Sequence, residues 1–588
     1  MEDTWKLEDI YINKEEWQKD IEGIYSKLDE ISDYQNKIKR GEDIYNCYYI
    51  YEKILEMFEK VYSYGMFKFH QNMADTNNIE LFKKVEKISS DIEIKTAFIV
   101  PEISKIDEKE LKGFLDSDPR LKSYETVINN IIEQKKHTLS ENEEKIIASF
   151  SEVFKGSENT FDIFTNTEFK YPKIKDENGN MVEITDGTYS KYMGSSDQNV
   201  RTQAFDSMYS LYKKHINTIT ELYMTRVKED CIISKLRKYQ SSLEKAVIND
   251  DATLNVYTSL IEVVNKNIEI NHKYISLKKK MLGLKEMHMY DIYVNKFKNN
   301  DEQIEYKDAQ NIILKALEPL GKEYIEMLKV AFTNRWIDVY ERENKRSGAY
   351  SSGVYGVHPF VLTNYTKTTR DVSTIAHELG HAMHSYYSNK TQNVINANYT
   401  IMVAEVASTV NEILLSEYLI KNEKDEIKKA ALINERIDDI RATLIRQSMF
   451  AEFEKIVHEK NEKLESLTSE KLCNIYYDLN KKYFGQDIII DENIKYEWAR
   501  IPHFYSCFYV YKYATGISAA ISIATKILNK EPGIVEKYIN MLKQGSQKKS
   551  VELLKMVDVD LESTKPYEDA FKFYEDNIKK LIDITYSK

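Results

Sequence analysis

The chain has 588 residues and a formal net charge of −12, with 83 basic against 95 acidic residues. A chain of this length can bury a large core, and the acidic balance argues against a general role on nucleic acids or acidic membranes. Only 18 glycines and 8 prolines occur, while 30% of the residues are charged. This composition predicts many long helices and few tight turns.

The first residues, MEDTWKLEDIYINKEEW, carry acids where a signal peptide would have a basic and then an apolar stretch. The longest uncharged, apolar-leaning run lies between Lys512 and Lys526 and is too short to span a bilayer. The four cysteines are scattered along the chain and form no CxxC pair. We therefore expect a soluble, reducing, cytoplasmic setting, with no nucleic-acid or membrane partner.

Helical periodicity dominates the N-terminal part of the chain, from about residue 15 to residue 157. The pattern then changes, and residues 168–185 read as two short strands. They are joined at Asn178-Gly179, a strong hairpin signal because both residues tolerate a positive φ. Helical patterning resumes near residue 198 and continues to about residue 343.

A second non-helical stretch follows at residues 346–367 and contains three glycines, Gly348, Gly353 and Gly356. Within it, HPFVLTNY (358–365) is typical of a strand. The proline at the start of this strand predicts an edge position, since proline cannot donate to a central ladder.

The segment DVSTIAHELGHAMHSYYSN (371–389) places two histidines one helical turn apart, with an acid beside the first. A capping box between Thr368 and Asp371 predicts that the helix begins near Thr368. On such a helix His377 and His381 can converge on one metal ion, and Glu378 can reach a water there without ligating the metal. A polar face of an ordinary helix is the alternative explanation of this pattern.

A catalytic zinc needs a third protein ligand and an open position. Residues 382–404 contain no Asp or Glu, and the first carboxylate is Glu405, within an apolar helical stretch. Burying this acid unpaired would be costly, and ligation to a cation removes that cost. Glu412 lies two turns further on the same face and could orient a ligand. We expect His384 to pack behind the ligands, and the other histidines that could join a site are His358 and His503.

These motifs resemble oligoendopeptidase F, in the thimet-oligopeptidase-like zinc metallopeptidases. The resemblance is carried by HELGHAMHSYYSNK followed by YTIMVAEVASTVNE, by WKLEDIY near the start, by KRSGAYSSGVY and PFVLTNY before the motif, and by RIPHFYSCFYVYKYATG (500–516) after it. It implies a mainly α fold, a two-lobed helical ellipsoid with a deep substrate channel and a small β hairpin or sheet near the zinc site. It also implies an N-terminal helical region (1–110), an oligoendopeptidase F-type N-terminal domain with the hairpin (111–197) and a zinc metallopeptidase catalytic domain (198–588).

Carried over to this chain, the resemblance implies one zinc ion held by His377, His381 and Glu405, with Glu378 as general base. It also implies that a histidine and tyrosines of the C-terminal region contact the substrate and the oxyanion. After His503 the segment is shorter than in the thimet branch, so we favour Tyr511 and Tyr509, with Tyr505 and Tyr513 behind them. Gly353 and Tyr355 are the expected substrate-binding residues of the glycine-bearing segment.

The expected function is zinc-dependent hydrolysis of internal peptide bonds in short, unstructured oligopeptides. Two alternatives stay open at this point. One is a zinc exopeptidase, carboxypeptidase-like or an aminopeptidase, on the same helical scaffold, which would need a charged group to hold a substrate terminus. The other is a helical peptide-binding protein without a metal. The sequence does not indicate the oligomeric state.

Overall fold

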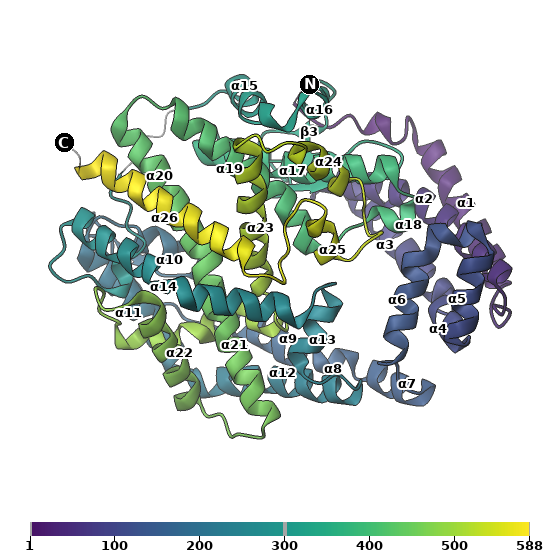
Figure 1. The fold of residues 1–588 in the computed structure, drawn as a ribbon, viewed down its shortest axis with the longest axis horizontal. Helices are drawn as coiled ribbons and strands as arrows, with labels where there is room; N and C mark the ends of the chain where they lie inside the picture. Colours follow the sequence, from purple (N-terminus) through teal and green to yellow (C-terminus); the bar gives the residue numbers. More distant parts are fainter. Residues whose placement is uncertain (1–2, 298–302, 587–588) are drawn as a thin grey trace. The chain divides into compact units, whose positions relative to one another are not determined.

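The computed structural model describes residues 3–297 and 303–586 of the chain, and it is mainly helical, as expected (Figure 1). Its contacts divide it into two compact units, and each unit is assembled from three stretches of sequence. Unit 1 comprises the described residues of Met1–Lys136, Asp301–Tyr418 and Ile523–Asp558. Unit 2 comprises those of His137–Asn300, Leu419–Ser522 and Val559–Lys588. Among the described residues, no helix combines the length and the apolar character needed to cross a membrane.

The helices and strands of unit 1 are α1 (Lys14–Ser32), α2 (Gly41–Gln71), α3 (Thr76–Thr96), α4 (Ile99–Lys105), α5 (Glu108–Ser117), α6 (Glu125–Lys135), α15 (Tyr306–Ala316), α16 (Lys322–Thr333), β3 (Ile337–Asp338), β4 (Tyr350–Ser352), β5 (Phe360–Leu362), α17 (Thr369–Thr391), α18 (Val394–Ala397), α24 (Ile534–Leu542) and α25 (Ser550–Lys555). Helices α19 (Ile401–Asn422) and α23 (Tyr511–Leu528) carry residues of both units.

The helices and strands of unit 2 are α7 (Glu141–Ser149), α8 (Ser151–Phe154), α9 (Gly156–Ile163), β1 (Lys173–Lys175), β2 (Met181–Glu183), α10 (Asp186–Met193), α11 (Gln198–Lys214), α12 (Ile216–Leu236), α13 (Ser242–Asn249), α14 (Leu254–Leu282), α20 (Glu426–Ile440), α21 (Arg446–Glu462), α22 (Ser469–Phe484) and α26 (Lys565–Tyr586). The short 3₁₀ helices η7 (Glu492–Arg500) and η8 (Pro502–Tyr505) precede α23. The expected hairpin is confirmed, because β1 and β2 pair antiparallel around the Asn178-Gly179 turn, where Gly179 has a φ of 81°.

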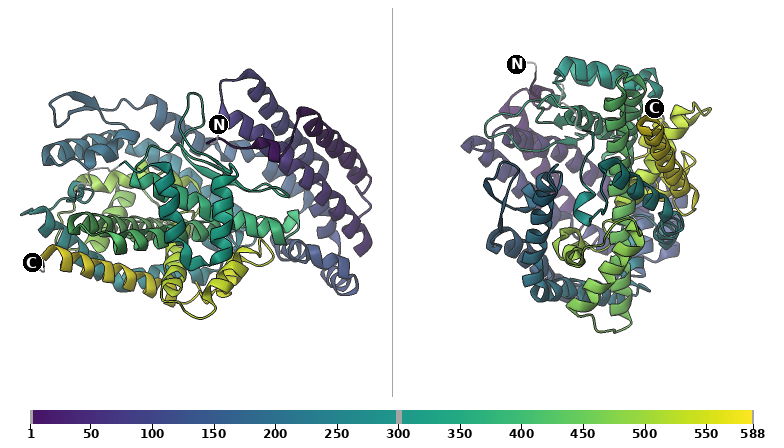
Figure 2. Two further views of the ribbon diagram at one scale, coloured as in Figure 1. Left: turned by 90° about the horizontal axis from the view of Figure 1, so that it is seen from above. Right: turned by 90° about the vertical axis from the view of Figure 1, so that its left-hand side faces the viewer.

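The N-terminal helices of unit 1 lie side by side, α1 against α2 and α2 against α3, as the purple helices of Figures 1 and 2 show. Their apolar faces form one core with the sheet strand β5. Trp5 joins the chain start to that strand, since its indole N–H donates to the carbonyl of Val361 at 2.7 Å. Its ring packs 4.8 Å from Phe67 and 6.2 Å from Phe360, measured between centroids.

The sheet of unit 1 has the strand order β3-β5-β4, with β3 parallel and β4 antiparallel to β5. The expectation that the strand after Pro359 lies at an edge was wrong, because β5 is the central strand. Pro359 precedes the first paired residue, so its missing N–H is not needed by the ladder. The strand β4, which packs against α17, is an outer strand instead.

Candidate active site

The helix α17 carries the histidine pair and begins as the sequence predicts. Thr368 is its N-cap, and the side chain of Asp371 closes a capping box with it. Gly380 lies where α17 meets α19, and a Cβ at this position would lie 2.6 Å from the Cα of Ser408 and 2.7 Å from the carbonyl oxygen of Ala407. The two helices therefore approach each other more closely than any side chain at residue 380 would allow.

This approach brings the three predicted ligands together. Donor atoms of His377, His381 and Glu405 all lie within 4.8 Å of one another. The two Nε2 atoms are 3.2 Å apart, and the Nε2 of His377 lies 3.9 Å from a carboxylate oxygen of Glu405. Two imidazoles and one carboxylate at these separations are a donor set that fits a catalytic zinc.

Each imidazole also makes a hydrogen bond to a group outside the three proposed ligands. The Nδ1 of His377 donates to Glu412 at 3.1 Å, and the backbone of Ala404 hydrogen-bonds His381. Burial opposes protonation of His377, but the hydrogen bond and charge of Glu412, together with the charges of Glu378 and Glu405, outweigh it and raise the pKa of this imidazole. Burial, together with the charge of His377, lowers the pKa of His381 to about 4. The orienting role predicted for Glu412 matches this arrangement.

Glu378 is 7% exposed, and its carboxyl interacts electrostatically with His377, Glu405 and Glu412. Burial raises the pKa of its carboxyl to about 7; His377 opposes this shift, and the charge of Glu405 adds to it. A carboxyl that titrates near neutral pH can both accept and return a proton.

Two other histidines serve the packing of unit 1. His384 is fully buried and stacks on Tyr399 with centroids 3.5 Å apart, as expected for a residue behind the ligands. Burial lowers the pKa of its imidazole to about 3. His358 stacks on Trp336 at 4.7 Å and its Nε2 lies 3.1 Å from Asp9, and it is not part of the ligand group.

A cavity of about 400 Å³ adjoins the strand β4 and the helix α17. Gly353 and Tyr355 line it, together with Ser385 of α17 and Tyr399, which precedes α19. A Cβ on Gly353 would come 2.8 Å from that of Ser385, so a glycine is required for β4 to lie this close to α17. Glu59 of α2 also lines the cavity, and burial raises its pKa. Sequence reasoning missed Glu59, because it is one of many acids in a charged amphipathic helix.

The proposed C-terminal residues lie in unit 2. His503 and Tyr509 stack with centroids 5.9 Å apart, and the hydroxyl of Tyr513 lies 3.3 Å from the Nε2 of His503. The hydroxyl of Tyr511, in contrast, is buried and donates to Asp250 at 3.0 Å. Tyr505 is buried as well, stacked on Phe161 at 4.6 Å. This geometry favours Tyr509 and Tyr513 over Tyr511 and Tyr505 as the partners of His503.

Comparison with known proteins agrees with this site. The model of Peptidase family M3 matches residues 191–573, and the model described as Oligopeptidase F matches residues 102–171. Oligopeptidase PepF of Bacillus subtilis (strain 168) is 40% identical over 584 residues, which cover 99% of this chain and 87% of that protein.

Solved structures of peptidases are similar to this chain as well. The crystal structure of a protein from Chlamydophila abortus, described as a peptidase, is 33% identical with a TM-score of 0.93, covering 99% of this chain and 98% of that one. Oligoendopeptidase-F from Enterococcus faecium is 30% identical with a TM-score of 0.73, covering 97% of this chain and 100% of that one. The match over most of the length thus confirms the resemblance found in the motifs and argues against a non-enzymatic binding protein. The chain belongs to peptidase family M3, a family of metallopeptidases.

Proposed function

We propose that the chain is a zinc-dependent endopeptidase that hydrolyses internal bonds of short, unstructured oligopeptides. The observation that carries this proposal is the convergence of His377, His381 and Glu405 beside the buried Glu378. Such a donor set leaves a coordination position open for a substrate. A zinc ion held there would polarise the scissile carbonyl and lower the pKa of water.

Glu378 is the proposed general base. Its carboxylate accepts a proton from the attacking water and then delivers that proton to the nitrogen of the leaving amine. Burial raises the pKa of this carboxyl to about 7, and a zinc ion held beside it would favour the carboxylate form that accepts the proton.

The outer strand β4 is the proposed binding site for the substrate backbone. It lies against α17, and its unpaired edge can add an extended peptide as a further strand. Recognition through backbone groups makes little demand on the side chains of the substrate. Gly353 and Tyr355, which follow β4, would contact the peptide within the adjoining cavity.

His503 and the neighbouring tyrosines are the proposed donors to the oxyanion of the tetrahedral intermediate. One such donor is typically worth about 2.7–4 kcal/mol of transition-state stabilisation. Among the tyrosines, Tyr509 and Tyr513 have the arrangement beside His503 that supports this role, whereas Tyr511 and Tyr505 have buried hydroxyls.

Digestion of a mixed peptide library, with and without a chelator, tests the proposal by mass spectrometry. We expect cleavage at internal bonds, its loss with the chelator and its recovery on addition of zinc. Cleavage that persists without any metal would contradict the proposed chemistry.

The exopeptidase alternative has one specific observation in its favour. Glu59, half-buried in the cavity beside β4, could hold the ammonium group of a substrate terminus. Peptides blocked at both ends, by N-terminal acetylation and C-terminal amidation, distinguish the two functions, because an endopeptidase cleaves them and neither an aminopeptidase nor a carboxypeptidase does. Unchanged rates after both modifications and in Glu59→Gln would support the endopeptidase.

We also propose that the chain acts in the cytoplasm. None of its four cysteines forms a disulfide in the structure, which is typical of proteins from a reducing compartment.

A further inference from the structure

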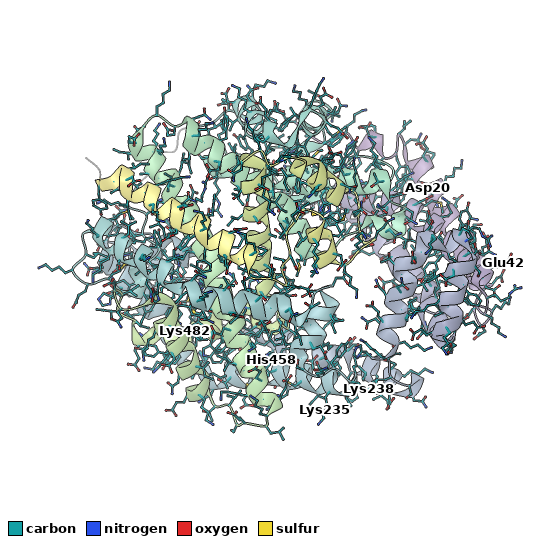
Figure 3. The ribbon with its side chains drawn as sticks, viewed as in Figure 1. Asp20, Glu42, Lys235, Lys238, His458 and Lys482 are labelled. Atoms are coloured by element: carbon teal, nitrogen blue, oxygen red, sulfur yellow. The ribbon has the colours of Figure 1, made fainter. Side chains whose placement is uncertain are left out.

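A second group of metal-ligating side chains lies in unit 2, and nothing in the proposed active site uses it. Asp230 on α12, His458 on α21 and Cys507 just before α23 bring a carboxylate oxygen, an imidazole nitrogen and a thiol sulfur within 4.8 Å of one another. Asp230 and His458 are only 2% and 1% exposed. Figure 3 labels His458 on α21. From the sequence it is one of several histidines with no apparent role.

The distance between the donor atoms of His458 and Asp230 matches that between two ligands of one metal ion. The Nε2 of His458 lies 3.6 Å from the nearer carboxylate oxygen of Asp230, too far for a hydrogen bond. Bonds of about 2.0–2.3 Å to a tetrahedral zinc place two ligand atoms roughly 3.5 Å apart.

The hydrogen bonding of His458 leaves its Nε2 available to bind a metal ion. Its Nδ1 lies 2.9 Å from the backbone carbonyl of Glu454, one turn earlier on the same helix. A carbonyl can only accept, so Nδ1 carries the hydrogen, and the buried Nε2 has no hydrogen-bond partner. Metal-ligating histidines are held in this way, with the second nitrogen donating to a carbonyl or carboxylate.

Two ionisable side chains, Glu454 and Arg226, lie beside this group. Glu454 is fully buried; one of its carboxylate oxygens accepts from the N–H of Phe508 at 2.6 Å, and the other has no partner. Burying a carboxylate oxygen without a partner costs free energy of folding, and a nearby cation removes that cost. Arg226 donates to both oxygens of Asp230, at 3.0 and 3.2 Å, and so fixes that carboxylate.

We propose that unit 2 holds a second divalent cation of the zinc class, bound by Asp230, His458 and Cys507. Thiolate and imidazole ligands favour zinc or cobalt over magnesium and calcium. Binding releases the thiol proton to solvent. Because Asp230 and His458 are almost completely buried, we assign the ion a structural role. Because Cys507 lies between His503 and Tyr513, the ion ties that segment to α12 and α21.

Titration of the metal-free, full-length protein with Co²⁺ under reducing conditions tests this site independently of activity. A cysteine ligand produces a thiolate-to-cobalt charge-transfer band in the near ultraviolet. The ligands proposed for the active site contain no sulfur, so a cobalt ion there would not produce the band. We expect the band in the wild-type protein, its loss in Cys507→Ser, and Co²⁺ affinity weaker by about tenfold or more in Asp230→Asn.

Cys473→Ser is the matched control, because Cys473 is also buried in unit 2 but, among the residues that the structure describes, belongs to no group of potential ligands. This variant should keep the full band. Absence of the band in the wild-type protein would overturn the proposal, whatever the folding of the variants, and would leave a buried Asp230–His458 ion pair as the explanation of the cluster. A band that survives in Cys507→Ser would overturn it as well.

Discussion

Glu378 and Glu405 are both carboxylates of the proposed active site, but their surroundings assign them different tasks. Glu378 follows a ligand directly in sequence and has a pKa raised to about 7 by burial. Glu405 comes from another helix and lies 3.9 Å from the Nε2 of His377. Substitutions that change one carboxyl at a time therefore separate metal binding from proton transfer.

In Glu378→Gln, we expect the metal to remain and nearly all turnover to be lost. Glutamine matches the side chain in size and can still hydrogen-bond to water, but it cannot accept the proton. General base catalysis is typically worth about 10²–10⁴-fold in rate. Metal content and kcat on a fluorogenic peptide check this result, and kcat near the wild-type value would identify another group as the base, with His503 examined first.

In Glu405→Ala, we expect the metal content of the purified protein to fall, because the variant lacks the third proposed ligand. Activity should fall with it and recover in part when zinc is added in excess. Glu417→Ala on the same helix is the control and should keep its metal, since Glu417 is not in the ligand group. Full zinc and full activity in Glu405→Ala would show that the ligand is wrongly assigned.

At the scale of elements, the close approach of α17 and α19 determines the spacing of the ligands. His377 and His381 come from α17, and Glu405 and Glu412 come from α19. Gly380 is the residue that permits this approach.

We expect Gly380→Ala to destabilise the protein by about 1–3 kcal/mol, as overpacked sites typically do, and to weaken metal binding. The reason is that the added Cβ would press on the backbone of Ser408. Gly113→Ala is the matched control: this glycine lies within α5 and nothing surrounds its Cβ position within 4 Å, so the change should stabilise by roughly 0.5–1 kcal/mol. Thermal unfolding measures both, and equal shifts would contradict the argument.

At the scale of the whole molecule, each compact unit is built from three separate stretches of the chain. The proposed ligands, the base and the β4 edge all belong to unit 1. The histidine and tyrosines proposed to contact the substrate belong to unit 2, together with the second cation site.

We expect the enzyme to cut short unstructured peptides and to spare folded proteins. A substrate that pairs with the edge of β4 must offer several residues of extended backbone, which a loop held by its own fold does not offer. One cleavable sequence can be presented twice, as a free oligopeptide and within a surface loop of a stable protein. Comparable cleavage of both would contradict this selectivity and leave the metal chemistry unaffected.

Local patterns in the sequence determined the features that depend on near neighbours. The helix start at Thr368, the placement of His377 and His381 on one face and the Asn178-Gly179 hairpin all follow from spacing within a few residues. Helical and turn geometry repeat over such short distances, so the sequence alone is sufficient.

Only the tertiary structure decided which distant residues meet. It made β5 central and β4 an outer strand, because strand order depends on pairing between segments far apart in the chain. It also decided the partners of the tyrosines: the hydroxyl of Tyr511 donates to Asp250, whereas that of Tyr513 lies beside the Nε2 of His503. It also assembled Asp230, His458 and Cys507, whose positions in the sequence have no common spacing, since burial in one core brings such residues together without any local signal.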